Sequence, residues 1–178
     1  MAPHTPTPSP RGWRARKRED EPLLGYGPIG ATDSVTLLYS YRYLLEYAEF
    51  EAERARQRAE PFAVVMVELC DLESINRRDG YAAGDAALYD VARALEEAVA
   101  ETAAIAGRYS GRRLAAIMPK SGQTAGTAAV HRLLSRIDGG NASVRTAVAV
   151  WQRGDQGAAV LARARLTLER DAAIALER

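Results

Sequence analysis

The pattern of apolar and polar residues changes several times along this chain, and each change predicts an element. Residues 62–69 form an unbroken apolar run of strand length, which is typical of a strand covered on both faces. The predicted elements, in chain order, are a helix over 36–60, the strand over 62–69, a short helix or turn over 71–78, a helix over 85–103, strands over 105–109 and 114–118, a helix over 122–137, a strand over 143–151 and a helix over 155–177. This alternation predicts an α/β fold, an α+β sandwich whose central mixed sheet contains one antiparallel hairpin and is flanked by helices.

The beginning of the chain has a different composition from the rest. Residues 1–31 hold most of the prolines and a basic run from Arg11 to Arg18. Such a segment cannot bury enough apolar surface to offset the entropy of an unfolded chain. We therefore predict a disordered Pro/Arg-rich tail over residues 1–31 and one folded domain over residues 32–178.

Charge and composition exclude several classes of protein. Lys and Arg number 24 and Asp and Glu number 23, so the chain lacks the cationic surplus of a general nucleic-acid binder. Cys70 is the single cysteine, which rules out an intramolecular disulfide and a Cys-based zinc site. No apolar run approaches the roughly 18 residues that a membrane span needs. We expect a cytoplasmic domain without a membrane span.

Four short motifs follow one another in the predicted domain. They are Asp33-Ser-Val-Thr-Leu-Leu-Tyr-Ser-Tyr-Arg42, Glu68-Leu-Cys-Asp-Leu-Glu-Ser-Ile-Asn76, Gly84-Asp85, and Arg108-Tyr-Ser-Gly-Arg-Arg-Leu-Ala-Ala-Ile-Met-Pro119. In this order they resemble the GGDEF family of diguanylate cyclase domains, whose patterns are D-x-L-T-G-L-x-N-R-R, D-I-D-x-F-K-x-I-N, G-D and R-Y-G-G-D-E-F-x-x-x-x-P. The resemblance covers about residues 33–178 and implies a GGDEF, nucleotidyl-cyclase-like sheet flanked by helices.

The resemblance also implies a reaction that this chain lacks the residues to perform. In the family, a ribose hydroxyl attacks the α-phosphate of GTP with the help of two Mg²⁺ ions, which carboxylates hold. The first metal carboxylate falls at Glu68, but Arg112 and Arg113 replace both acids of the signature. A guanidinium has no lone pair to give to Mg²⁺. We therefore predict a degenerate domain that is not an enzyme and has no catalytic residue, metal site or cofactor.

The two arginines of the signature suggest a substitute for the metal. If the backbone fold is retained, a guanidinium should lie roughly where the metal would be, beside Glu68. Arg113 is the better candidate for this ion pair and Arg112 the second, because an arginine supplies both charge and hydrogen bonds in a fixed geometry. The alternative is that the same arginines bind a phosphate of an incoming nucleotide.

Two residues match the positions at which the family binds guanine, namely Asn76 and Asp85. A carboxylate can accept hydrogen bonds from guanine N1–H and from the exocyclic amine together. A structural alternative is that Asp85 caps the helix that it begins and that Asn76 ends a helical turn.

The first predicted helix carries more aromatic residues than a single core face requires. At about 100° per residue, its core face is predicted to contain Leu37, Tyr41, Leu44, Leu45, Ala48 and Ala52. A second, aromatic stripe is predicted on the opposite face and consists of Tyr39, Tyr43, Tyr47 and Phe50. Because aromatic residues are enriched at interfaces, the stripe predicts contact with a protein partner or a second copy of the chain. The alternative is that the chain's own tail folds back to cover it.

Taken together, these observations predict a catalytically inactive GGDEF-like regulatory domain. Its expected role is that of a protein-interaction module in cyclic di-GMP or guanine-nucleotide signalling. The alternative function is a sensor that binds GTP or cyclic di-GMP without cyclase activity.

Overall fold

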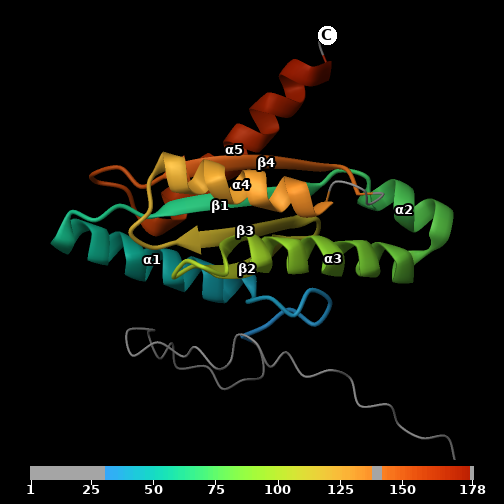
Figure 1. Cartoon of the computed structure of the whole chain (residues 1–178), viewed down its shortest axis with the longest axis horizontal. Helices are drawn as coiled ribbons and strands as arrows, with labels where there is room; N and C mark the ends of the chain where they lie inside the picture. The colour runs from blue at the N-terminus through green and yellow to red at the C-terminus, as the bar shows by residue number, and fades with distance from the viewer. Residues whose placement is uncertain (1–30, 138–141, 177–178) are drawn as a thin grey trace, which may run out of the picture.

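The computed structural model describes residues 31–137 and 142–176, and it consists of one sheet with helices on both faces (Figure 1). The predicted tail, apart from residue 31, and the predicted turn at 139–141 lie outside the described residues. The elements are α1 (Tyr41–Arg58), β1 (Ala63–Leu69), α2 (Leu72–Asp79), α3 (Tyr81–Val99), β2 (Ile105–Ser110), β3 (Arg113–Met118), α4 (Gln123–Ile137), β4 (Val144–Val150) and α5 (Gly157–Leu176).

The four strands lie in the order β2-β3-β1-β4, and every neighbouring pair is antiparallel. The mixed sheet expected from the sequence is therefore not formed by these strands. The reason lies in the helical connections, which join β1 to β2 and β3 to β4. The two strands of each of these pairs run parallel, but another strand lies between them, so they do not pair with each other. A parallel pairing occurs only as an isolated bridge between Tyr39 and Gly107, among the residues that the structure describes.

Each face of the sheet has its own hydrophobic core. One core lies under α1 and α5 and contains the side chains of Val64 and Met66, and the other lies under α3 and α4 and contains Val65 and Val67. All seven residues of β1 are buried, as the unbroken apolar run at 62–69 predicts for a central strand. No described helix is both long enough and apolar enough to cross a bilayer.

The first and last of the four sequence motifs meet at one corner of the fold. The carboxylate of Asp33 accepts hydrogen bonds from the backbone N–H of Thr36 at 2.8 Å and from its hydroxyl group at 2.8 Å. It also accepts two hydrogen bonds from Arg108 Nη1, at 3.1 Å each. Partial burial opposes ionisation of Asp33, but the hydrogen bonds of Thr36 and the charge of Arg108 outweigh it and lower the pKa. This pair ties the segment before α1 to β2.

Helix α1 begins at Tyr41 rather than at residue 36, because Ser40 serves as its N-cap and accepts a hydrogen bond from the N–H of Tyr43. Residues 33–38 form a turn instead, in which Leu37 has a positive φ of 60°. Leu37 and Tyr41 are consequently 36% and 48% exposed, so their predicted place on the core face is wrong. Leu44, Ala48 and Ala52 are buried as expected.

The predicted position of the aromatic stripe, on the face opposite the core, is also wrong. Tyr39, Tyr43 and Tyr47 are each no more than 7% exposed, belong to the core under α1 and α5, and have Phe50 packed against them. The ring centroids of Tyr39 and Tyr43 are 3.8 Å apart, and those of Tyr43 and Tyr47 are 6.4 Å apart. The physical reason is angular: successive residues of a helix differ by about 100°, so Tyr43 and Tyr47 lie beside Leu44 and Ala48 rather than opposite them. These rings contribute to the core, and the alternative cover, the tail over residues 1–30, lies outside the described residues.

Candidate functional site

Glu68 lies at the end of β1, on the sheet face that α1 and α5 cover. In the register of the sheet it is directly opposite Arg113 of β3 on one side and Arg145 of β4 on the other. Because alternate residues of a strand point to the same face, its side chain continues the row of Val64 and Met66. The side chains of Arg113, Glu68 and Arg145 therefore lie next to one another on one face of the sheet, with the acid between the two arginines.

The carboxylate of Glu68 is fully buried and accepts hydrogen bonds on both of its oxygens. Arg113 Nε donates to Oε2 at 2.5 Å, and Arg145 Nη2 donates to Oε1. Arg112, from the turn before β3, forms a longer ion pair with Oε1 at 3.3 Å. The structure thus brings together all three residues that the sequence proposed for this place, Glu68, Arg112 and Arg113, and adds a third arginine.

The ionised form of Glu68 is favoured in spite of its burial. Burial alone would raise the pKa of this carboxyl, but the hydrogen bonds from Arg113 and Arg145 and the charges of Arg113 and Arg112 together lower it. The hydrogen bond to Glu68 in turn raises the pKa of Arg145. Glu68 is therefore ionised at neutral pH and is hydrogen-bonded to two arginines.

A second acid from α5 extends the cluster outward. Glu169 Oε1 lies 3.2 Å from Arg113 Nη1, and both of its oxygens accept hydrogen bonds from Arg165 Nη1 at 2.8 Å. Arg113 therefore joins β1 to α5 through two carboxylates. We name the six residues of this arrangement the arginine cluster; they are Glu68, Arg112, Arg113, Arg145, Arg165 and Glu169.

Sequence reasoning missed Arg145, Arg165 and Glu169. The strand that contains Arg145 was predicted, but its neighbour in the sheet and its register were not, and those decide that Arg145 faces Glu68. A usable signal was present nevertheless: Arg145 is the only charged residue in an otherwise uncharged strand, Val144–Val150. Such a residue in a strand next to a buried acid is a natural partner for it.

Asn76 and Asp85 lie at the junction of α2 and α3, and α2 follows the end of β1 after two residues. Asn76 is in α2, and its Oδ1 is buried without a hydrogen-bond partner. Gly84 of α3 makes room for this amide, since a Cβ on Gly84 would come within 1.8 Å of Oδ1. Among the described residues no hydrogen bond or ion pair connects this pair to the arginine cluster.

The capping alternative for Asp85 is wrong. Helix α3 begins at Tyr81, after Gly80 with φ 90°, so Asp85 lies in its second turn and not at its start. The side chain of Asp85 is exposed. The backbone carbonyl of Asn76 does accept a hydrogen bond from the N–H of Gly80 at 3.0 Å, at the end of α2.

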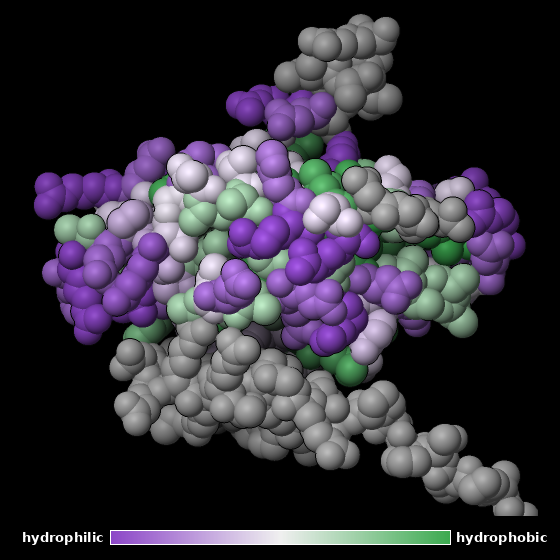
Figure 2. Space-filling view, viewed as in Figure 1, coloured by the Kyte–Doolittle hydropathy of each residue, from purple (hydrophilic) through white to green (hydrophobic). Residues whose placement is uncertain are grey.

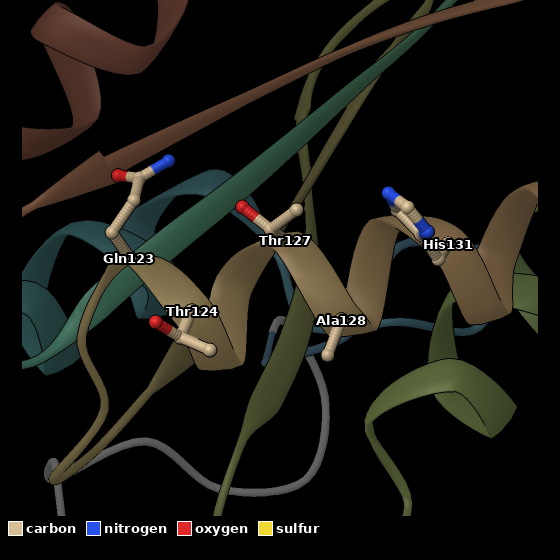
Figure 3. A pocket seen from close by; sticks show the side chains of 5 residues that line it. All are labelled: Gln123, Thr124, Thr127, Ala128 and His131. Carbon is tan, nitrogen blue, oxygen red and sulfur yellow. The ribbon is translucent and has the colours of Figure 1, made fainter.

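The described surface also contains a depression away from these residues. A shallow depression runs along α4, and its described lining consists of Gln123, Thr124, Thr127, Ala128 and His131 (Figure 3). None of the residues proposed from the sequence lines it. On the face seen in Figure 2, hydrophilic side chains are dispersed among smaller hydrophobic areas rather than gathered in one place. No group of His, Cys, Asp and Glu that could hold a metal ion occurs within the described part of the chain.

Comparison with known proteins identifies relatives of this fold. Residues 30–170 match the family described as diguanylate cyclase, GGDEF domain. The GGDEF domain of DgcB from Caulobacter crescentus, in complex with c-di-GMP, is similar with a TM-score of 0.76 and 18% identity, over 82% of this chain and 91% of that one. The GGDEF domain of FimX from Pseudomonas aeruginosa has a TM-score of 0.74 and 20% identity, over 80% and 93%. The diguanylate cyclase SiaD from Pseudomonas aeruginosa, in complex with its activator SiaC, has a TM-score of 0.69 and 24% identity, over 80% and 60%. These likenesses confirm the predicted fold class.

Proposed function

Because this chain belongs to the GGDEF family of diguanylate cyclase domains, we propose that it acts in cyclic di-GMP signalling as a regulatory domain that makes no cyclic di-GMP. The observation that carries the proposal is the pairing of Glu68 with Arg113 and Arg145. Both oxygens of the one remaining family carboxylate accept guanidinium hydrogen bonds. The residues present therefore do not fit Mg²⁺, which needs oxygen ligands and would be repelled by three nearby cations.

A domain without its own chemistry must signal by binding. The similar structures include a GGDEF domain determined with c-di-GMP and a diguanylate cyclase determined with a protein activator. We propose that this chain contacts a protein partner and transmits a regulatory state to it. Since the aromatic stripe of α1 is part of the core, the proposal does not rest on those residues.

The direct test is a cyclase assay on the purified full chain with GTP and either Mg²⁺ or Mn²⁺. We expect no cyclic di-GMP, because no metal can be held between Glu68 and the signature turn. An active GGDEF protein assayed in parallel shows that the conditions support the reaction. Product that forms with the wild-type chain and disappears with Glu68→Ala would refute the proposal.

A second candidate function, binding of a guanine nucleotide, is favoured by the surroundings of Asp85. Its side chain is exposed and has no capping role, so it remains available to accept hydrogen bonds from guanine. The Oδ1 of the neighbouring Asn76 packs against Gly84, and its amide N–H groups remain as donors. An amide donor and an exposed carboxylate are the two groups that the Watson–Crick edge of guanine requires.

Replacement of Asp85 by alanine is expected to weaken GTP binding by about tenfold to a hundredfold, because hydrogen bonds to a charged group are worth about 1.5–3 kcal/mol. Isothermal titration with GTP and ATP measures this, and ATP should bind more weakly than GTP to the wild-type chain. Asp90→Ala is the matched control, since Asp90 is an exposed acid of the same helix. Equal competition by ATP, or equal effects of both substitutions, would exclude Asp85 as the guanine-selective residue.

A further inference from the structure

Strand β4 forms one edge of the sheet, and no strand of the described residues lies on its outer side (Figure 1). The N–H of Trp151 donates to the carbonyl of Phe62 at 2.9 Å, and the N–H of Cys70 donates to the carbonyl of Ser143 at 2.8 Å, at the two ends of the β1–β4 pair. Along an antiparallel strand, residues bonded to a given neighbour alternate with residues that are not. The odd-numbered residues of β4 therefore bond to β1, and the even-numbered ones direct their N–H and C=O groups outward. These outward residues are Val144, Thr146, Val148 and Val150.

The opposite edge of the sheet, β2, is covered. The N–H of Tyr39 donates to the carbonyl of Ala106 at 3.1 Å, and the N–H of Arg108 donates to the carbonyl of Tyr39 at 2.7 Å. The pairing of β2 with β3 also contains a register shift between Arg108 and Ser110. Cover and irregularity are two ways in which proteins keep an edge strand from pairing with another chain. Within the described part of the chain, β4 has no such cover, and its register with β1 is continuous.

The side chains of β4 are suited to pairing with another strand. Its outward residues are all β-branched, a type that favours strands, and they are only partly buried. The strand contains no proline or glycine. Its one charged residue, Arg145, lies on the other face of the sheet and is hydrogen-bonded to Glu68. The edge therefore lacks the charges and prolines that exclude an added strand.

Helix α4 places an apolar side chain beside this edge. Arg132 Nε donates to the carbonyl of Ala98 at 2.7 Å, and Arg136 Nε lies 3.4 Å from a carboxylate oxygen of Glu97, so this side of α4 faces α3. Leu134 is two positions from each arginine and is therefore about 200° away around the helix. Because α4 packs on β1 and β4, its side away from α3 lies toward the β4 edge. Leu134 is 37% exposed there.

We propose that β4 is a dimer interface, at which a second copy of this chain adds its own β4 in antiparallel orientation. The inference goes beyond the proposed function and uses neither the arginine cluster nor the guanine residues. A two-fold axis at Ala147 pairs Thr146 with Val148 of the second copy, and Val144 with Val150 of the second copy. Each pair joins residues with open backbone groups and exchanges two hydrogen bonds. On the axis, the two alanines are small enough for the close approach of a pair without hydrogen bonds.

The strand is complementary to itself in this register, which is why we infer a second copy rather than an unrelated strand. An axis at any other residue would pair at least one outward residue with a position outside β4. The axis at Ala147 also places Arg145 opposite Ala149 of the second copy, so the two Arg145 side chains are not directly opposite each other. A closed two-fold dimer uses the same surface of both copies and leaves no open β4 edge on either.

Analytical ultracentrifugation of the full chain at a series of concentrations tests the interface. We expect a monomer–dimer equilibrium in which Thr146→Pro weakens the dimer about a hundredfold, since two symmetry-related N–H donors are lost. Proline is compatible with the monomer, because an edge strand tolerates it where the N–H points outward. Thr146→Lys should weaken the dimer about tenfold by placing like charges on neighbouring strands, and keeps the test valid if the proline variant unfolds. Thr124→Lys is the control, because Thr124 is exposed on α4.

A cysteine on the two-fold axis tests the register. In a chain that also has Cys70→Ser, Ala147→Cys would bring two thiols together at a Cα–Cα distance of about 4.5 Å, within the range of a disulfide. We expect oxidised glutathione to link this variant into a covalent dimer. Ala128→Cys in the same background should stay unlinked, because Ala128 is exposed on α4 away from the axis. Circular dichroism verifies that each variant is folded.

The results that would overturn the interface are distinct from those that bear on the proposed function. A chain that is monomeric at every concentration would refute it, and so would a dimer that both Thr146 variants leave unchanged. A dimer weakened equally by Thr124→Lys, or equal cross-linking at residues 128 and 147, would place the contact elsewhere. None of these measurements contains a nucleotide, so their failure leaves the cyclase assay and the GTP titration unaffected.

Discussion

Replacement of Glu68 by glutamine is expected to lower the free energy of unfolding at neutral pH by about 3 kcal/mol. The substitution keeps the size of the side chain but removes the charge that three guanidinium groups share. Removing one partner of a buried ion pair costs about 3–5 kcal/mol, because the other charge is left uncompensated. The lower end applies here, since Arg113 and Arg145 remain 18% and 34% exposed and water can partly solvate them.

The effect should depend on pH in a defined direction. The pKa of Glu68 in the folded chain is lower than the value of 4.5 that it has without these contacts. Its contribution to stability is therefore fully present above pH 4.5 and is lost as the pH falls towards the folded-state pKa. The difference between the wild-type chain and Glu68→Gln should be largest at neutral pH and should shrink in acid.

Chemical denaturation at a series of pH values measures both expectations. Glu73→Gln is the control, because Glu73 is 82% exposed in its pair with Arg77, and its replacement should change the stability by less than about 0.5 kcal/mol. If Glu68→Gln were as stable as the wild type at neutral pH, the buried ion pair would not tie the hairpin to β1.

Replacement of Gly157 by alanine is expected to destabilise the fold by about 3 kcal/mol, although alanine is the better helix former by about 1 kcal/mol. Gly157 is the first residue of α5, and it packs directly on the backbone of α1. A Cβ at this position would be 2.2 Å from the carbonyl carbon of Ala48 and 2.4 Å from the backbone nitrogen of Glu49. Backbone atoms of a packed helix cannot move aside as a flexible side chain can.

If α5 moved away from α1 to make room for this Cβ, the N-terminal cap of α5 would also be lost. The carboxylate of Glu49 accepts hydrogen bonds from the N–H groups of Gly157 at 2.9 Å and Ala158 at 2.8 Å. Thermal and urea unfolding should show the loss, and Gly111→Ala is the control because a Cβ there meets nothing within 4 Å. Equal stability of the two variants would show that α5 shifts away from α1 without cost.

Much of this fold could be predicted because its signals are local. The unbroken apolar run of β1, the helical spacing of the flanking segments and the motif order identified the elements and the fold class. The motif that resembles the family signature contains Arg112 and Arg113, and the order of the motifs predicted that both lie near Glu68. These inferences depend on residue types and on short distances along the chain, which the sequence contains in full.

The boundaries of the helices were harder to predict from the sequence. Helix α3 begins four residues earlier than predicted, directly after Gly80. The positive φ of Gly80 ends α2 and allows the chain to turn into α3. That shift changes the interpretation of Asp85 from a cap to an exposed carboxylate. The tyrosines of α1 were assigned to the wrong environment for a related reason, since the width of the buried face depends on how many elements pack around the helix.

The sequence by itself identified the GGDEF family and put two arginines, Arg112 and Arg113, in the turn that resembles the family signature. Only the tertiary structure decided that Arg145 and Glu169 join those arginines, that the aromatic residues of α1 are buried, and that Gly157 must remain a glycine. In each case the deciding contact joins segments far apart in the chain. Strand order, register and helix packing set such contacts, and they result from the packing of the whole domain rather than from any local pattern.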